Sequence, residues 1–157
     1  MTRSSKILLV EDDPNDVELT LSALTRNRLS CEIAVVRDGQ EALDYLLRQG
    51  DYASREEVNP PVVLLDLKLP KVSGIEVLER VKTDPYLRTV PVVVLTSSRE
   101  ERDVLRSYDL GTNAYVVKPV DFQDFSEAVK QLGLFWTVIN QAPPDNIGRA
   151  YEPHEPT

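Results

Sequence analysis

The sequence has little of what marks several classes of protein. Its one cysteine, Cys31, cannot form an internal disulfide, which fits a reducing cytoplasm. Only four apolar residues follow Lys6, too few for a signal peptide or a membrane span. The formal net charge of -8, without a basic stripe, argues against a nucleic-acid surface, and no zinc-ligand spacing occurs. We therefore expect a cytoplasmic protein that binds neither membrane nor nucleic acid.

What the sequence does have is an alternation of short apolar runs with helical patterns. The length of 157 residues, 41% hydrophobic and 28% charged, suits one domain with a real core. Strands are predicted at residues 7–10, 32–36, 62–65, 91–95 and 114–117, and a helix after each. Nearly continuous apolar strands that alternate with helices predict an α/β fold. We expect a doubly wound, five-stranded parallel sheet covered on both faces by five helices.

Capping signals mark where several helices begin. Asp13 followed by Pro14 predicts a helix start, and Asp121 can cap the last helix. Ser98 and Glu101 form a capping-box pattern ahead of the fourth helix. These signals place residues 1–140 in one domain.

After residue 140 the sequence changes character. Residues 141–157 are rich in proline and polar side chains, and they include the only histidine, His154. Such a segment either stays flexible or orders as an arm on a partner, for example in a dimer. We treat it as a C-terminal tail separate from the domain.

The segment VVLLDLKLP, residues 62–70, ends an apolar strand in a carboxylate, Asp66. A solvated aspartate at a strand end would be ordinary. However, parallel strands bring their carboxyl ends to one edge of a sheet, where ligands bind. The other predicted strands end there in polar residues as well: Glu11, Asp12 and Asp13; Thr96 and Ser97; and Lys118.

This set of side chains is chemically coherent. Clustered carboxylates repel one another unless a proton or a cation relieves them, and Mg²⁺ prefers such oxygen ligands. A lysine such as Lys118 would pair with the charge of a phosphoryl group. Aspartate is a covalent phosphoryl acceptor in several enzymes. We therefore predict that Asp66 is a nucleophile for phosphoryl transfer.

Four motifs resemble those of bacterial response-regulator receiver domains, the CheY-like family. They are ILLVEDD, VVLLDLKLPKVSG, VVVLTSS and AYVVKP, and the resemblance covers residues 5–140. Thirty residues separate Asp66 from Thr96, and twenty-two separate Thr96 from Lys118, as in the family. The resemblance implies the flavodoxin-like receiver fold.

The resemblance also implies roles for single residues. Asp66 would be the phosphoacceptor, Thr96 would hydrogen-bond the phosphoryl group, and Lys118 would supply the ammonium. Thr96 and Tyr115 would form the switch that reports phosphorylation. The bond between Lys118 and Pro119 would be cis.

A magnesium site is implied by the same resemblance. Asp12 would bind Mg²⁺ directly and Glu11 through water. Asp66 and the backbone carbonyl of Lys68 would complete the protein ligands, while Asp13 would serve as a helix cap.

A phosphohistidine donor must belong to another protein, because the sequence has no histidine within the fold. A sensor histidine kinase is the donor that the resemblance implies, with small phosphodonors as an alternative. KTDPYLRTVPVVVLTSS and LGLFWTVINQAPP resemble regulators that partner bacterial phytochrome kinases, which implies a red-light-sensing donor. No DNA-binding motif follows, so we expect output through protein contact.

The last helix carries more apolar residues than one core stripe needs. The stripe itself is predicted to be Phe122, Phe125, Val129, Leu132, Trp136 and Ile139. Leu134, Phe135 and Val138 remain on other faces, which predicts a homodimer interface there.

Other functions fit parts of the same pattern. The resemblance implies a signalling protein rather than an enzyme, although family members catalyse their own phosphorylation from small donors and their own dephosphorylation. Within signalling, a phosphorelay intermediate or a chemotaxis-type regulator is an alternative. A haloacid-dehalogenase-like phosphatase would need a second aspartate where Lys68 stands, and a pseudo-receiver scaffold would not need the intact acidic set.

Overall fold

The computed structural model describes residues 5–26 and 32–144. Cys31, His154 and most of the tail, residues 145–157, lie outside the described residues. Five parallel strands form one sheet in the order β2-β1-β3-β4-β5. The strands are β1 (Lys6–Val10), β2 (Glu32–Val36), β3 (Val63–Leu65), β4 (Val92–Thr96) and β5 (Ala114–Val117). All five predicted strands are confirmed to within one residue at either end.

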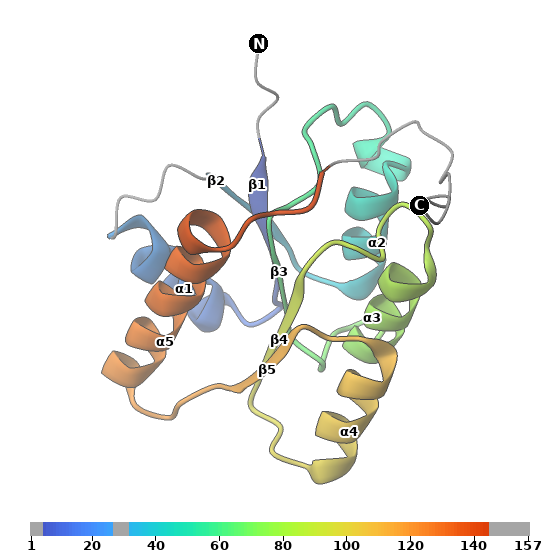
Figure 1. The fold of residues 1–157 in the computed structure, drawn as a ribbon. Coiled ribbons are helices and arrows are strands. Elements are labelled where there is room, and N and C mark those ends of the chain that lie inside the picture. The colour runs from blue at the N-terminus through green and yellow to red at the C-terminus, as the bar shows by residue number, and fades with distance from the viewer. Residues whose placement is uncertain (1–4, 27–31, 145–157) are drawn as a thin grey trace, which may run out of the picture.

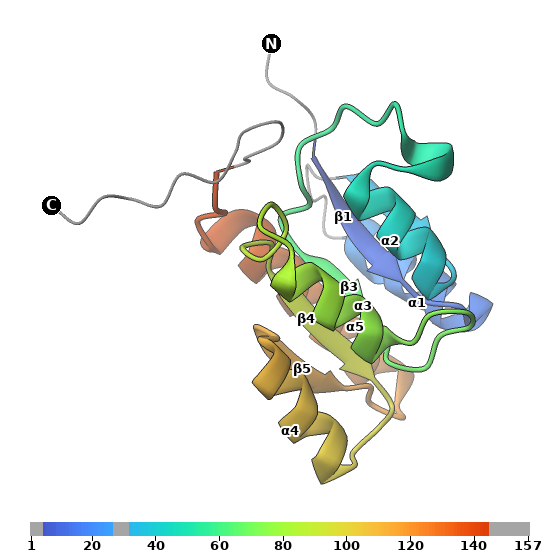
Figure 2. The same ribbon diagram turned by 90° about the vertical axis from the view of Figure 1, so that its right-hand side faces the viewer.

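Helices cover both faces of this sheet. They are α1 (Pro14–Thr25), α2 (Gly39–Leu47), α3 (Gly74–Thr83), α4 (Glu101–Leu110) and α5 (Phe122–Leu134). Figure 1 shows α1 and α5 on one side of the sheet and the other three helices on the opposite side, which faces the viewer in Figure 2. Among the described residues, none of these helices has the length and apolarity that crossing a membrane requires.

Alternate residues of each strand supply two separate cores. In β1, Leu8 and Val10 belong to the cluster under α2 and α3, while Ile7 and Leu9 belong to the cluster under α1 and α5. The buried members of both clusters are hydrophobic side chains that are at most 7% exposed. A sheet that is buried on both faces explains the unbroken apolar runs in the sequence.

Helix caps agree with the sequence in two of the three predicted cases. The side chains of Asp13 and Asp121 accept hydrogen bonds from the first backbone amides of α1 and α5. The capping box predicted from Ser98 and Glu101 is wrong, because α4 begins only at Glu101. Instead, the Ser98 hydroxyl donates to Asp103 at 2.6 Å, which anchors the β4–α4 connection to the helix.

The core stripe predicted along the last helix is correct only in its middle. Phe125 and Val129 are buried, and Leu132 and Trp136 pack against the same cluster. Phe122, the first residue of α5, is 50% exposed.

Ile139, at the other end of the stripe, is also exposed, because the helix changes its period. A π-helical segment, Phe135–Ile139, follows directly on α5, and the amide of Asn140 donates to the carbonyl of Phe135. The wider turn of a π-helix rotates later residues off a stripe drawn at α-helical spacing. Ile139 therefore points away from the core.

Candidate functional site at the carboxyl edge of the sheet

The ladder of the sheet continues one residue beyond three strands and positions the polar groups. The amide of Glu11 donates to Val36 at 3.1 Å, and that of Asp66 donates to the carbonyl of Val10 at 3.1 Å. The amide of Lys118 donates to the carbonyl of Thr96 at 2.8 Å. Because the backbone is fixed up to these residues, their side chains converge at one edge, where the strand order reverses.

Lys118 lies at the centre of this edge. Its ammonium group donates to Glu11 at 2.6 Å, to Asp66 at 2.8 Å and to Asp16 at 2.8 Å. Its side chain is 9% exposed, so these charges meet largely away from water. The bond from Lys118 to Pro119 is not cis, contrary to the implication of the resemblance. The trans form is favoured even before proline, by about 0.5–1 kcal/mol.

The ionisation of these groups follows from burial and from the lysine. Burial raises the pKa of Glu11 to about 7. The hydrogen bond and charge of Lys118 lower this pKa, and the negative charge of nearby Asp66 raises it further. Burial also opposes the ionisation of Asp66, but the hydrogen bond and the charge of Lys118 hold its pKa below the usual range. Asp66 is therefore an unprotonated carboxylate at neutral pH, the form that a nucleophile requires.

Three carboxylates could hold a metal ion together. Ligand oxygens of Glu11, Asp12 and Asp66 all lie within 4.8 Å of one another. Two of these residues are buried and Asp12 is exposed, which leaves an open side for water or for a substrate. All-oxygen ligands of this kind fit a divalent cation. Lys68 donates its amide to Asp66 at 3.2 Å, and the role of its carbonyl stays a prediction.

Asp16 is the member of the site that the sequence analysis missed. It lies in the first turn of α1, within the capped start of that helix. Its position four residues after Asp12 is the signal that could have found it. A helix that begins at the site keeps its first turn near the site, so a carboxylate there was a candidate.

Thr96 and Tyr115 are connected through one residue of the β4–α4 connection. The hydroxyl of Thr96 accepts from the amide of Ser98 at 3.4 Å. The hydroxyl of Tyr115 donates to the carbonyl of the same residue at 3.0 Å. A movement of Thr96 would therefore reach Tyr115 through Ser98, while the switch role of the pair stays a prediction.

Gly74 allows α3 to begin directly against the end of β3. A methyl group at this position would collide with the carbonyl oxygen of Asp66 and the Cα atom of Leu67. The amide of Gly74 donates to the carbonyl of Leu67 at 3.0 Å. This close approach fixes the backbone that carries Asp66.

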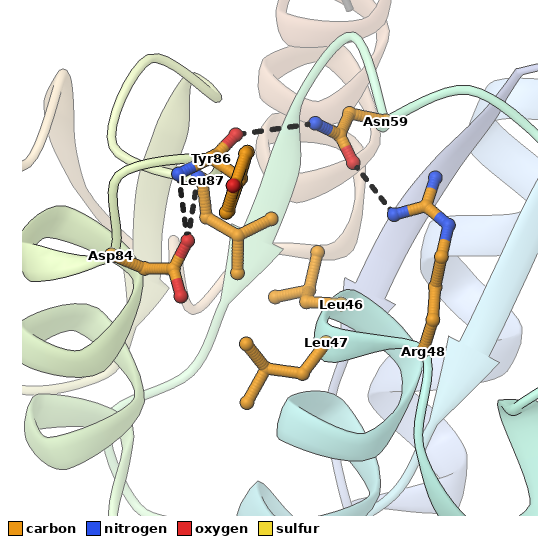
Figure 3. Close-up of a pocket in the computed structure, with 7 residues that line it drawn as sticks. All are labelled: Leu46, Leu47, Arg48, Asn59, Asp84, Tyr86 and Leu87. Atoms are coloured by element: carbon orange, nitrogen blue, oxygen red, sulfur yellow. Dashed lines mark hydrogen bonds between the residues drawn. The ribbon is translucent and has the colours of Figure 1, made fainter. Parts of the chain in front are cut away.

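A separate pocket lies near the amino ends of the strands, away from the carboxyl edge (Figure 3). Its volume is about 310 Å³, and it lies between the end of α2, the segment before β3 and the turn before β4. Three leucines project into it, with polar groups around them. The lining residues are Leu46, Leu47, Arg48, Asn59, Asp84, Tyr86 and Leu87. It contains none of the carboxylates around Lys118, so the two sites are distinct.

Comparison with known proteins gives one family. The model of the response regulator receiver domain matches residues 7–130, most of the chain. Response regulator Rcp1 from Synechocystis sp. is 41% identical over 83% of this chain and 87% of that protein. The probable methanogenesis regulatory protein FilR2 from Methanothrix harundinacea is 42% identical over 87% of this chain and 86% of its own length.

Solved structures agree with this result. The bacteriophytochrome response regulator RtBRR is 61% identical, with a TM-score of 0.72 over 92% of this chain and 86% of that one. The Mn²⁺-bound form of Rcp1 has a TM-score of 0.84 and 38% identity, over 89% of this chain and 99% of its own. A divalent cation in that relative agrees with the carboxylate cluster found here.

The arrangement around Lys118 predicts how its loss changes stability. Lys118→Met leaves buried carboxylates without a counter-charge, so the free energy of unfolding at neutral pH should fall by about 3–5 kcal/mol with metal chelated. Added Mn²⁺ should restore part of the loss, because a cation replaces the ammonium. Lowering the pH should also restore part of the lost stability of Lys118→Met. Without the lysine, the pKa values of Glu11 and Asp66 in the folded state rise above their unfolded values, so protonation favours the folded variant. Urea unfolding measures all three effects.

The matched control is Lys68→Met, which removes an exposed positive charge beside the same site. It should cost little and respond little to Mn²⁺. If both variants lost the same stability, Lys118 would be no more than a surface charge.

Proposed function

This chain belongs to the response regulator receiver domain family, and on that premise we propose that Asp66 accepts a phosphoryl group from a sensor histidine kinase. Phosphorylation of an aspartate is typical of receiver domains, which are in general signalling proteins. The observation that carries the assignment is the contact of Asp66 with Lys118 beside two further carboxylates at the carboxyl edge. No other described aspartate combines a lysine partner, burial and the metal-binding carboxylates.

The transfer itself follows from the geometry. A carboxylate oxygen of Asp66 attacks phosphorus, and the bond from phosphorus to the histidine nitrogen of the donor breaks. The bonding electron pair stays on that nitrogen, which takes a proton from water. Lys118 and Thr96 then pair with phosphoryl oxygens.

Magnesium is the cation that we propose for the acidic cluster. Glu11, Asp12, Asp66 and the backbone carbonyl of Lys68 would hold it. When bound, Mg²⁺ neutralises the charge of the phosphoryl oxygens. The residues fit this ion because all of them offer hard oxygen ligands.

A red-light-sensing kinase is the donor that we propose. The support is the 61% identity to RtBRR, a bacteriophytochrome response regulator, against 42% to FilR2, whose name concerns methanogenesis. We place this protein in the cytoplasm. Output would then pass through protein contact.

A homodimer through the last helix is also part of the proposal. Phe135 and Val138 are 44% and 67% exposed, and the ring of Phe135 packs edge-on against Trp136, which holds it in place. Leu134 lies at the margin of this patch and is partly buried. A two-fold contact would cover the same patch on both copies.

The first test of the proposal is labelling of Asp66. Asp66→Asn should reduce labelling by acetyl phosphate to background, because an amide is not a nucleophile, and EDTA should do the same to the parent. Asp13→Asn is the matched control, since asparagine caps a helix as well as aspartate does. Equal labelling of the parent and Asp66→Asn on a phosphate-affinity gel would refute the assignment.

The donor is tested by phosphotransfer from purified kinases. We expect the bacteriophytochrome kinase of the host to label this protein at least about tenfold faster than unrelated histidine kinases, which corresponds to about 1.4 kcal/mol of preference. Time courses with each kinase at equal activity measure this ratio. Faster transfer from a kinase without a phytochrome sensor would contradict the donor, but not the role of Asp66.

The dimer is tested by sedimentation. The double variant Phe135→Glu, Val138→Glu should be a monomer and still accept phosphate on Asp66, because carboxylates facing their symmetry mates are unfavourable. Tyr86→Glu changes a side chain of similar exposure in the turn before β4, outside the last helix, and should leave the dimer intact. A parent that stays monomeric at high concentration, phosphorylated or not, would exclude this interface.

A further inference from the structure

We propose that Asp16 is a positioning residue that holds the ammonium of Lys118 in the resting state and competes with the phosphoryl group for it. This inference rests on the proposed phosphorylation of Asp66. Through Asp16, helix α1 would then influence how strongly the site binds a phosphoryl group.

All hydrogen-bond donors of the Lys118 side chain are occupied in the resting site. An ammonium group has three N–H donors, and here each has a carboxylate partner: Glu11, Asp16 and Asp66. No donor is left for a phosphoryl oxygen. When a phosphoryl group arrives, Lys118 must therefore release one of its present partners.

Exposure decides which partner is released. The side chain of Glu11 is 3% exposed, and its other oxygen already accepts the amide of Asp13 at 3.1 Å. Leaving Glu11 without the ammonium would strand a buried carboxylate, which is costly. The side chain of Asp16 is 28% exposed, so water can replace the lysine there. Asp66 itself carries the incoming group and stays beside Lys118.

Asp16 is also held independently of the proposed metal. Its backbone amide donates to the side chain of Asp13 at 3.3 Å, so the helix start fixes its position. The carboxylate group that could hold a metal consists of Glu11, Asp12 and Asp66, without Asp16. Asp16 can therefore influence Lys118 without taking part in cation binding.

Neutralising Asp16 should thus strengthen the binding of a phosphoryl mimic. Asp16→Asn keeps the shape of the side chain but removes a charged competitor for Lys118 and a repulsive charge beside the incoming anion. A charge-assisted hydrogen bond that no longer competes corresponds to a change of about tenfold in affinity.

The experiment titrates the full chain with beryllium fluoride in the presence of Mg²⁺, by calorimetry. Asp16→Asn should bind about tenfold more tightly than the parent, and its KM for acetyl phosphate should fall in the same direction. Asp16→Glu keeps the charge and should restore values near those of the parent. A purely structural role for Asp16 would change the unfolding temperature but not these affinities.

Glu18→Gln is the matched control, because it removes an exposed carboxylate from the same helix. Unchanged affinity in Asp16→Asn, a gain shared by Glu18→Gln, or weaker binding of beryllium fluoride would each overturn the inference. Asp66→Asn distinguishes a failure of the proposed function from a failure of the role of Asp16. If the parent binds no beryllium fluoride in an Asp66-dependent way, the proposed function fails together with this inference; if it does, only Asp16 is at issue.

Discussion

One ammonium group holds three carboxylates together at the carboxyl edge of the sheet, and the positions of the surrounding strand ends follow from this contact. Lys118 follows the edge strand β5, yet it reaches Glu11 after β1 and Asp66 after β3. Such contacts require that the groups stay closely placed, since a buried charge without a partner is costly. The ladder bonds that fix Glu11, Asp66 and Lys118 therefore serve the chemistry as well as the fold.

The same constraint leaves the edge with excess negative charge. Among the described residues, Lys118 is the one cation paired with Glu11, Asp16 and Asp66, and Asp12 adds a further carboxylate close by. A divalent cation would relieve this repulsion, which agrees with the Mn²⁺-bound structure of the relative Rcp1. A phosphoryl group brings negative charge back, so the cation and the ammonium both have to be redistributed when it arrives. The resting site is thus built to respond to a change in charge.

Much of this could be predicted from the sequence, because the strands are buried on both faces and read as apolar runs. Asp66 and Lys118 follow directly from where those runs end. Asp16 is a candidate from its spacing to Asp12, but its contact with Lys118 depends on how α1 rotates about its axis, and that is set by packing against α5 and the sheet. Ile139 was misplaced for a related reason: a π-helical turn leaves no clear mark in the pattern of apolar residues.

The charged site and the apolar pocket lie at opposite ends of the strands. The charged groups lie at the carboxyl ends of the strands, whereas the leucine-lined pocket of Figure 3 lies at their amino ends. Thr96 and Tyr115 belong to neighbouring strands, and both bond to Ser98, which in turn is anchored to α4 through Asp103. A displacement of Thr96 would therefore move the start of α4 and the ring of Tyr115 together. β4 is buried along its whole length, whereas Ser97, Arg99 and Glu100 of the connection to α4 are exposed, so this connection is the part of the network that reaches the surface.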